Sequence, residues 1–503
     1  MDATKFEKRF ETALQFLATE NFSDANRVLE QLLEKRPRHP GVLLNYGCAS
    51  AGLGKFDLAA EAWDKARRLA PKNPRLLLDL GHLHESINNM EASRDCFRSA
   101  MAIEPNAIDP RISIAVTLEK NHRLAEARHF IEECLSIDAK DEQACYFSAV
   151  LDHRENKLEE AECKLRDLIV AEPKHPYVVY ACRYELAQIL DRKGCFDEAM
   201  LMLVEAKKRV RTLAEVEEIG AQYDEQARLY NDYAKSLSRD ILHDWSKSFP
   251  ESRRTVIPRL AFLGGHPRSG TTLLEQILGS HPQVKAYDET PAFGQSVLSK
   301  QRRSGQKLSH QRINALRREY IQFLRQMSAS NPDEKLLIDK NPSPTAFLPL
   351  WLRVFPELHV LMALRDPRDV IISCYFQNLP LNVINSNFLS LERIAKHYAD
   401  LMNVWLVVRE WKGFSWLETR YEDIVANLKP EGQRVTKFLG LEWHEDQESF
   451  YKNKRGVKVN SPTYHDVTQP IYGRSVNRWR VYEKYLSSVL PILEPYCRAF
   501  GYS

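Results

Sequence analysis

The sequence predicts an α-helical solenoid followed by a parallel α/β domain. Small residues and prolines recur every 34 residues over the first 200 positions, and from residue 259 short apolar runs alternate with helical periodicity. A chain of 503 residues is also long enough for two or more domains. We therefore expect a solenoid at 1–207, a capping helix and linker at 208–255, and the α/β domain at 256–503.

The repeat keeps one register over five units. Proline ends four of the units, and Ala139 fills the remaining place. Closely packed helices need small residues where they touch, large apolar residues then fill the groove of the next repeat, and proline ends a helix. This pattern resembles the tetratricopeptide repeat. The prolines are Pro37, Pro71, Pro105 and Pro173; the small residues are Gly47, Gly81, Ala115 and Ala149, and Ala25, Ala59, Ser93, Ala127 and Ala161; the large residues are Leu29, Trp63, Phe97, Ile131 and Leu165.

A sixth unit with Ala187 and Ala206 follows after a slip of four residues, and we interpret the stretch from Arg209 to Ser248 as the capping helix and linker. Such arrays present a concave surface, so an extended protein or peptide is the expected partner. The alternative is a scaffold that packs only on the α/β domain or on a second copy of the chain, as in a homodimer.

Composition indicates an ordinary globular protein. The net charge of +3 gives no indication of nucleic-acid binding, and no apolar stretch is long enough for a membrane span. The N-terminus begins "MDATKFEKRF", which does not resemble a signal peptide. Nine cysteines without a CxxC pair favour reduced thiols, so we expect a cytoplasmic protein.

The stretch "GGHPRSGTTLLEQILGSHP" (Gly264–Pro282) follows the apolar run "RLAFLGG" and opens an amphipathic helix. Amides at a helix N-terminus attract anions, and glycine lets the backbone approach a ligand. We expect Arg268, Ser269, Gly270, Thr271 and Thr272 to bind a phosphate or sulfate group. The loop lacks the lysine of a nucleotide-triphosphatase loop, which argues against a P-loop kinase or NTPase.

Further strands are expected at "KLLIDK" (Lys335–Lys340), "HVLMALR" (His359–Arg365) and "WLETRYED" (Trp416–Asp423), with a helix from Leu391 to Trp411. Strands that alternate with helices predict a parallel sheet.

From Leu260 to Tyr502 the chain resembles sulfotransferases that use 3′-phosphoadenosine 5′-phosphosulfate (PAPS). It is most similar to the tyrosylprotein sulfotransferases and to bacterial proteins that join tetratricopeptide repeats to a sulfotransferase domain. The resemblance implies that Arg365 and Ser373, in "LRDPRDVIISCYF", bind the 3′-phosphate. In "QPIYGRSVNRWRVYEKY" it assigns Arg478 to the same end of the nucleotide, with Arg474 as an alternative.

Tyr421 resembles a family tyrosine near the adenine, although a packed core tyrosine is an equal alternative. Trp479 is interpreted as a core anchor, and Asp366, Arg368 and Asp369 as residues that cap and charge a helix start.

The resemblance also implies the catalytic groups. In "SHPQVKAYDETPAF" the second acid, Glu289, matches the family's general base, with an acidic helix cap as the alternative. His266 and His281 are weaker candidates for the base. Lys340 matches a lysine that contacts the transferring sulfuryl group, and Arg268 shares that task. Cations and amides supply the stabilisation, so no metal is expected.

The expected activity is sulfuryl transfer from PAPS to a hydroxyl, most plausibly that of a protein or peptide tyrosine. A glycan or small-molecule acceptor remains open, as does a non-catalytic repeat adaptor. The animal tyrosylprotein sulfotransferases are lumenal, membrane-anchored and disulfide-bonded, and this chain shows neither an anchor nor a disulfide pattern.

Overall fold

The computed structural model describes residues 3–18, 21–87, 89–213, 215–298, 308–327, 335–452, 471 and 473–502. The chain divides into two compact units, the first covering residues up to Val178 and the second most of the chain from Val179 onward. The boundary expected at residue 207 remains a prediction.

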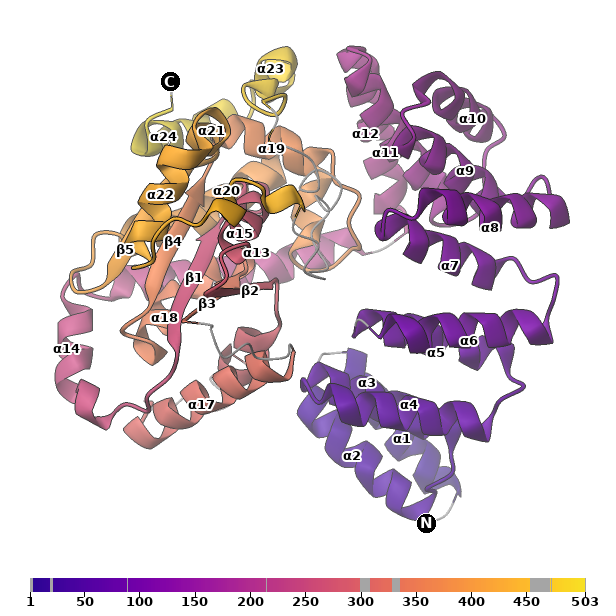
Figure 1. Ribbon diagram of the computed structural model, residues 1–503, viewed down its shortest axis with the longest axis horizontal. Coiled ribbons are helices and arrows are strands. Elements are labelled where there is room, and N and C mark those ends of the chain that lie inside the picture. The colour runs from indigo at the N-terminus through magenta and orange to yellow at the C-terminus, as the bar shows by residue number, and fades with distance from the viewer. Residues whose placement is uncertain are drawn as a thin grey trace. The chain divides into compact units, whose positions relative to one another are not determined.

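The first unit is a succession of antiparallel helices (Figure 1). The predicted register explains their packing, because a Cβ placed on Gly47 would lie 2.1 Å from the Trp63 side chain and one on Gly81 would lie 2.3 Å from Phe97. Trp63 and Phe97 therefore pack on the preceding helix of their own hairpin, whereas the sequence pattern placed them in the groove of the next repeat. The helices are α1 (Ala3–Ala18), α2 (Phe22–Lys35), α3 (Pro40–Gly52), α4 (Phe56–Leu69), α5 (Pro74–Ser86), α6 (Met90–Ile103), α7 (Asp109–Lys120), α8 (Leu124–Ile137), α9 (Glu142–Arg154) and α10 (Leu158–Val170).

The second unit contains a five-stranded parallel sheet in the order β2-β3-β1-β4-β5. This confirms the predicted architecture of helical repeats followed by a parallel α/β domain. The connection after β1 leads to β2 on one side of the sheet, whereas the connection after the neighbouring strand β4 leads to β5 on the other side. Ligands of such sheets bind beyond the carboxyl ends of the strands at the point where the order reverses. The strands are β1 (Arg259–Gly265), β2 (Val284–Asp288), β3 (Leu336–Lys340), β4 (His359–Leu364) and β5 (Ser415–Arg420).

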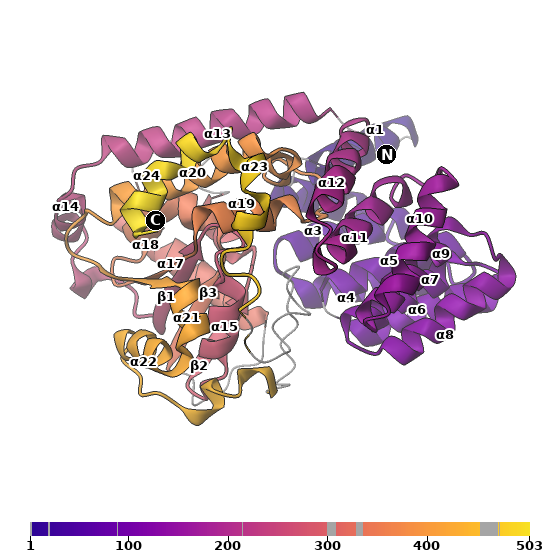
Figure 2. The same cartoon turned by 90° about the horizontal axis from the view of Figure 1, so that it is seen from above.

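Helices cover both faces of this sheet, and Figure 2 shows α13 outside α20 on one side and α15 and α22 on the other. Alternate β1 residues face the two layers: Leu263 packs in the core with α15 and α22, whereas Phe262 contacts Trp351 of α18. The helices of this unit are α11 (Val178–Arg192), α12 (Phe196–Arg211), α13 (Val216–Ser236), α14 (Ile241–Ser248), α15 (Thr271–Gly279), α17 (His310–Gln326), α18 (Leu348–Val354), α19 (Pro367–Tyr375), α20 (Leu391–Val408), α21 (Tyr421–Ala426), α22 (Leu428–Phe438), α23 (Glu483–Leu486) and α24 (Leu490–Phe500).

Three sequence-based expectations differ from the structure. The strand expected to run to Asp423 ends at Arg420, because acidic residues in the first turn favour helix α21 from Tyr421. The stretch from Arg209 to Ser248 is not one helix: α12 ends at Arg211, α13 runs from Val216 to Ser236, and α14 follows after Leu237, which is extended. Strand β2 was not expected.

Candidate active site

The loop between β1 and α15 has the geometry of an anion-binding loop. Gly270 caps α15 with a φ of 88°, and Arg268 has a φ of 73°. Ser269, Thr271 and Thr272 are buried around the N-terminus of the helix, where free amides and the helix dipole favour negative charge. A Cβ on Gly270 would lie 2.7 Å from Cδ2 of Tyr421, so only glycine fits here.

The structure brings the predicted phosphate-binding residues together at the carboxyl ends of β1 and β4. Arg268 donates from Nε to the hydroxyl of Ser373 at 3.1 Å, and Arg365 donates from Nη1 to the carbonyl of Arg268 at 3.1 Å. The Arg365 guanidinium also lies 5.0 Å from the ring centre of Tyr421. Its second terminal nitrogen donates to the Ser475 carbonyl, which ties the C-terminal segment to this cluster.

Lys340 lies at the end of β3 and pairs with both acids that follow from β2. Its ammonium contacts Asp288 and lies 3.0 Å from Oε1 of Glu289. Lys340 is 0% exposed, whereas the Glu289 side chain is 41% exposed. Burial lowers the pKa of Lys340, but the charges of Asp288 and Glu289 outweigh it and raise that pKa above its usual value. The site therefore holds a charged, buried lysine beside an accessible carboxylate.

Sequence reasoning missed two buried acids near this lysine. Burial, with the nearby charge of Asp288, raises the pKa of Glu275 on α15 to about 7. Burial likewise raises the pKa of Asp339 to about 7, although the Tyr320 hydroxyl donates to it at 2.7 Å. The sequence could have indicated Glu275 only as an acid on an otherwise apolar helix face. It placed Asp339 at a strand end but gave no indication of its burial.

Neither histidine considered as an alternative base presents a free nitrogen. His266 is fully buried, and its two ring nitrogens lie 2.7 Å from the Pro267 carbonyl and 2.7 Å from Nδ1 of His397. The His281 ring contacts the carbonyl of Glu442 and accepts from the amide of Gln283. Of the three candidates, Glu289 is the one whose side chain is substantially exposed, and its role as the base remains a prediction.

Arg478 is the predicted site residue that the structure holds apart. Its guanidinium pairs with Asp191 of α11 at 2.9 Å and lies 4.2 Å from the ring centre of Phe376. In the described part of the chain, no contact joins it to Arg365 or Ser373. Three positions of its motif, 469, 470 and 472, lie outside the described residues.

The C-terminal segment is fastened by an acid whose role the sequence did not reveal. Asp369 on α19 accepts hydrogen bonds from the backbone amides of Asn477 at 2.8 Å and Trp479 at 2.7 Å. Trp479 is buried as expected of a core anchor, and Asp366 caps α19 by accepting from the amide of Arg368.

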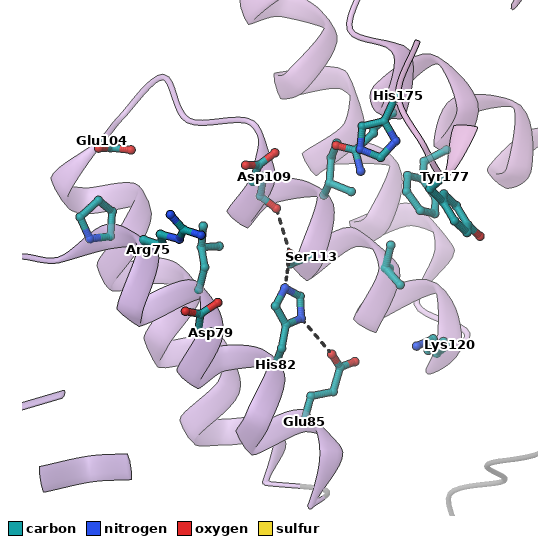
Figure 3. A pocket seen from close by; sticks show the side chains of 16 residues that line it. Arg75, Asp79, His82, Glu85, Glu104, Asp109, Ser113, Lys120, His175 and Tyr177 are labelled. Carbon is teal, nitrogen blue, oxygen red and sulfur yellow. Dashed lines mark hydrogen bonds and ion pairs between the residues drawn. The ribbon is translucent and has the colours of Figure 1, made fainter. Parts of the chain in front are cut away.

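The repeats contain a cavity of about 840 Å³ between α5, α7 and α9 (Figure 3). His82 lies at its centre, with Nε2 3.4 Å from the Ser113 hydroxyl and Nδ1 3.9 Å from Glu85. Tyr177 and Phe147 add aromatic surface. The lining therefore combines charged, polar and aromatic side chains.

Within the ranges described, every helix is too short or too polar to cross a bilayer. The nine cysteines are free thiols.

Residues 261–445 match the family model described as "Sulfotransferase family", and residues 47–108 match that of the tetratricopeptide repeat. An uncharacterized protein of Aquifex aeolicus (strain VF5) is 24% identical over 450 residues, which cover 87% of this chain and 52% of that protein. Protein-tyrosine sulfotransferase 2 of Gallus gallus is 23% identical over 265 residues, 48% of this chain and 66% of that protein. A sulfotransferase domain of the Synechococcus PCC 7002 olefin synthase aligns at 18% identity with a TM-score of 0.35, over 50% of this chain and 96% of that one. The chain thus spans about half the length of the Aquifex relative, and the family matches confirm the predicted resemblance.

Proposed function

Because the chain carries a sulfotransferase-family domain joined to tetratricopeptide repeats, we propose that it transfers a sulfuryl group from PAPS to the hydroxyl of a protein or peptide tyrosine. The observation that carries this proposal is that the anion loop with Arg268 and the Lys340–Glu289 ion pair both lie at the carboxyl ends of the strands of one sheet. Relatives named protein-tyrosine sulfotransferases support the choice of acceptor.

The residues present fit a nucleotide that carries a 5′-phosphosulfate and a 3′-phosphate. The Nε of Arg365 is buried without a hydrogen-bond partner among the residues that the structure describes, and an oxyanion would satisfy it. The loop from Arg268 to Thr272 holds the phosphosulfate, and Arg365 with Ser373 holds the 3′-phosphate. Tyr421 lies against Gly270 and lines the adenine side.

Arg478 is the third residue that we assign to the 3′-phosphate. Because its guanidinium pairs with Asp191, it can bind the 3′-phosphate only after releasing Asp191. Arg474 in the same segment is the alternative contact.

Glu289 accepts the proton of the acceptor hydroxyl as its oxygen forms a bond to sulfur. The bond between sulfur and the bridging oxygen breaks, and 3′,5′-ADP leaves with the bonding electrons. Lys340 and Arg268 stabilise the charge that develops on that oxygen, and the burial of Lys340 strengthens its interaction with that charge. These cations make a metal unnecessary to the proposed step.

The repeats bind the acceptor polypeptide in this proposal, and the cavity around His82 is the proposed binding site. The free thiols favour a reducing compartment, and we propose the cytoplasm.

The test is incubation of the full chain with labelled PAPS and a library of tyrosine-containing peptides, beside glycans and small phenols. We expect label on peptide tyrosine, and its loss in Arg268→Ala. Label found only on glycans or small molecules would refute the peptide acceptor, whereas sulfuryl transfer from PAPS would be supported. Full activity of Arg268→Ala would refute the mechanism, and no transfer to any acceptor would favour an adaptor.

A further inference from the structure

A pair of buried histidines joins the anion loop to a long helix of the second unit. His266 directly follows β1, and His397 lies in the middle of α20. They are 0% and 2% exposed, and Nε2 of His266 lies 2.7 Å from Nδ1 of His397. The other ring nitrogen of His266 lies 2.7 Å from the Pro267 carbonyl.

These contacts allow one arrangement of protons. The Pro267 carbonyl can only accept, so Nδ1 of His266 carries the proton and donates to it. A neutral His266 then has an unprotonated Nε2, which accepts from Nδ1–H of His397. Burial lowers the pKa of His266 to about 4 and lowers that of His397 well below its usual value, so both rings are neutral near pH 7.

Helix α20 is itself fixed by α13. Asn231 of α13 donates to the carbonyl of Asp400 at 3.0 Å, and Arg393 of α20 pairs with Asp224 of α13 at 2.9 Å. Tyr223 of α13 also contacts the His397 ring, with 5.4 Å between ring centres. His397 is therefore a fixed point against which the loop can be held.

The loop needs such support because its backbone is strained. Arg268, two residues after His266, has a φ of 73°, and non-glycine residues adopt this region only where the surroundings enforce it. The carbonyl of His266 also accepts from the amide of Ser269 at 3.1 Å, so the orientation of His266 sets the start of the turn.

We propose that His397 is a positioning residue that, through His266, holds the anion loop in its ligand-binding conformation. The inference rests on the proposed function of this loop. Loss of the bond from His397 leaves a buried nitrogen unsatisfied and lowers the fraction of molecules with an ordered loop, which weakens apparent affinity by the same factor.

The experiment measures 3′,5′-ADP affinity by calorimetry for the wild type and for His397→Leu, His397→Asn and His397→Gln. Leucine removes the donor, and we expect affinity to fall about tenfold. Asparagine places its amide nitrogen near the position of Nδ1 and should stay within about twofold of wild type. Glutamine fills similar volume but displaces the donor, so it should resemble leucine. Tyr398→Phe is the matched control, because it removes a hydroxyl from the neighbouring buried residue of α20 but keeps the ring that contacts His266 and the bond between the histidines.

Hydrogen exchange of the loop amides in the unliganded protein separates this inference from the function. We expect about tenfold faster exchange at Ser269 in His397→Leu and His397→Gln than in His397→Asn. Unchanged exchange and affinity in the leucine variant would overturn the inference, as would an asparagine variant as weak as glutamine. If the leucine variant does not fold, the asparagine–glutamine comparison decides. A wild type that binds no 3′,5′-ADP overturns the proposed function, while the exchange rates still test the positioning role.

Discussion

Replacing Lys340 by methionine should strongly destabilise the second unit. Methionine has nearly the volume of lysine but carries no charge, so the change isolates the ammonium. That ammonium is completely buried and contacts Asp288, whose side chain is only 4% exposed. Its removal also leaves the pKa of Glu275 free to rise, since the Lys340 charge currently lowers it.

The expected magnitude follows from this burial. Removing one partner of a buried ion pair costs about 3–5 kcal/mol, because the remaining charge stays desolvated. The contact with Glu289 adds little, since that side chain is 41% exposed. The matched control is Lys412→Met, which removes an exposed pair with Asp240 whose side chains are 77% and 63% exposed, and should cost less than about 1 kcal/mol.

Urea unfolding followed by tryptophan fluorescence measures both variants. Trp63 is the single tryptophan before residue 179, so the signal reports mainly on the second unit. The double variant Asp288→Asn with Lys340→Met should recover part of the loss, since no unpaired charge remains between them. A Lys340→Met variant as stable as Lys412→Met would refute this reasoning.

Three further predictions concern the loop, a buried lysine and the base. Gly270→Ala should lower the free energy of unfolding, measured in urea, by about 1–2 kcal/mol, because the φ of Gly270 is 88°. It should also weaken 3′,5′-ADP binding measured by calorimetry. The control Gly294→Ala, which places its Cβ in open space, should stay near wild type. Burial lowers the pKa of Lys207 to about 7, so the unfolded chain binds more protons between pH 7 and 10.5. Wild-type stability relative to Lys207→Met should rise by about 1.4 kcal/mol per pH unit in that window, and a pH-independent difference would contradict the shift. Glu289→Gln should lower kcat about 10²–10⁴-fold and leave 3′,5′-ADP affinity unchanged. Equal losses in kcat and in affinity would show instead that Glu289 acts in nucleotide binding.

The strands that the sequence predicted well are the buried ones. The runs that became β1, β3 and β4 lie in the interior of the sheet, and each contains a continuous apolar stretch, with charged residues only at the ends of β1 and β3. Of the edge strands, β2 was not predicted and β5 was predicted to be too long. One side of an edge strand meets solvent or loops, so its sequence mixes polar with apolar residues.

The local parts of the site could be read from the sequence, and the long-range parts could not. Arg268 and Gly270 belong to one contiguous loop, so their types and spacing carry the information. The bond from His266 to His397 joins residues 131 positions apart, and the pairing of Arg478 with Asp191 joins residues 287 apart. Neither has a local pattern, because such contacts depend on how whole helices pack.

The most direct test of the proposed function is a calorimetric titration of the wild-type chain with 3′,5′-ADP and, separately, with Mg·ATP. We expect 3′,5′-ADP to bind, Arg268→Ala to weaken that binding, and Mg·ATP to bind far more weakly. Tight binding of Mg·ATP alone would contradict it.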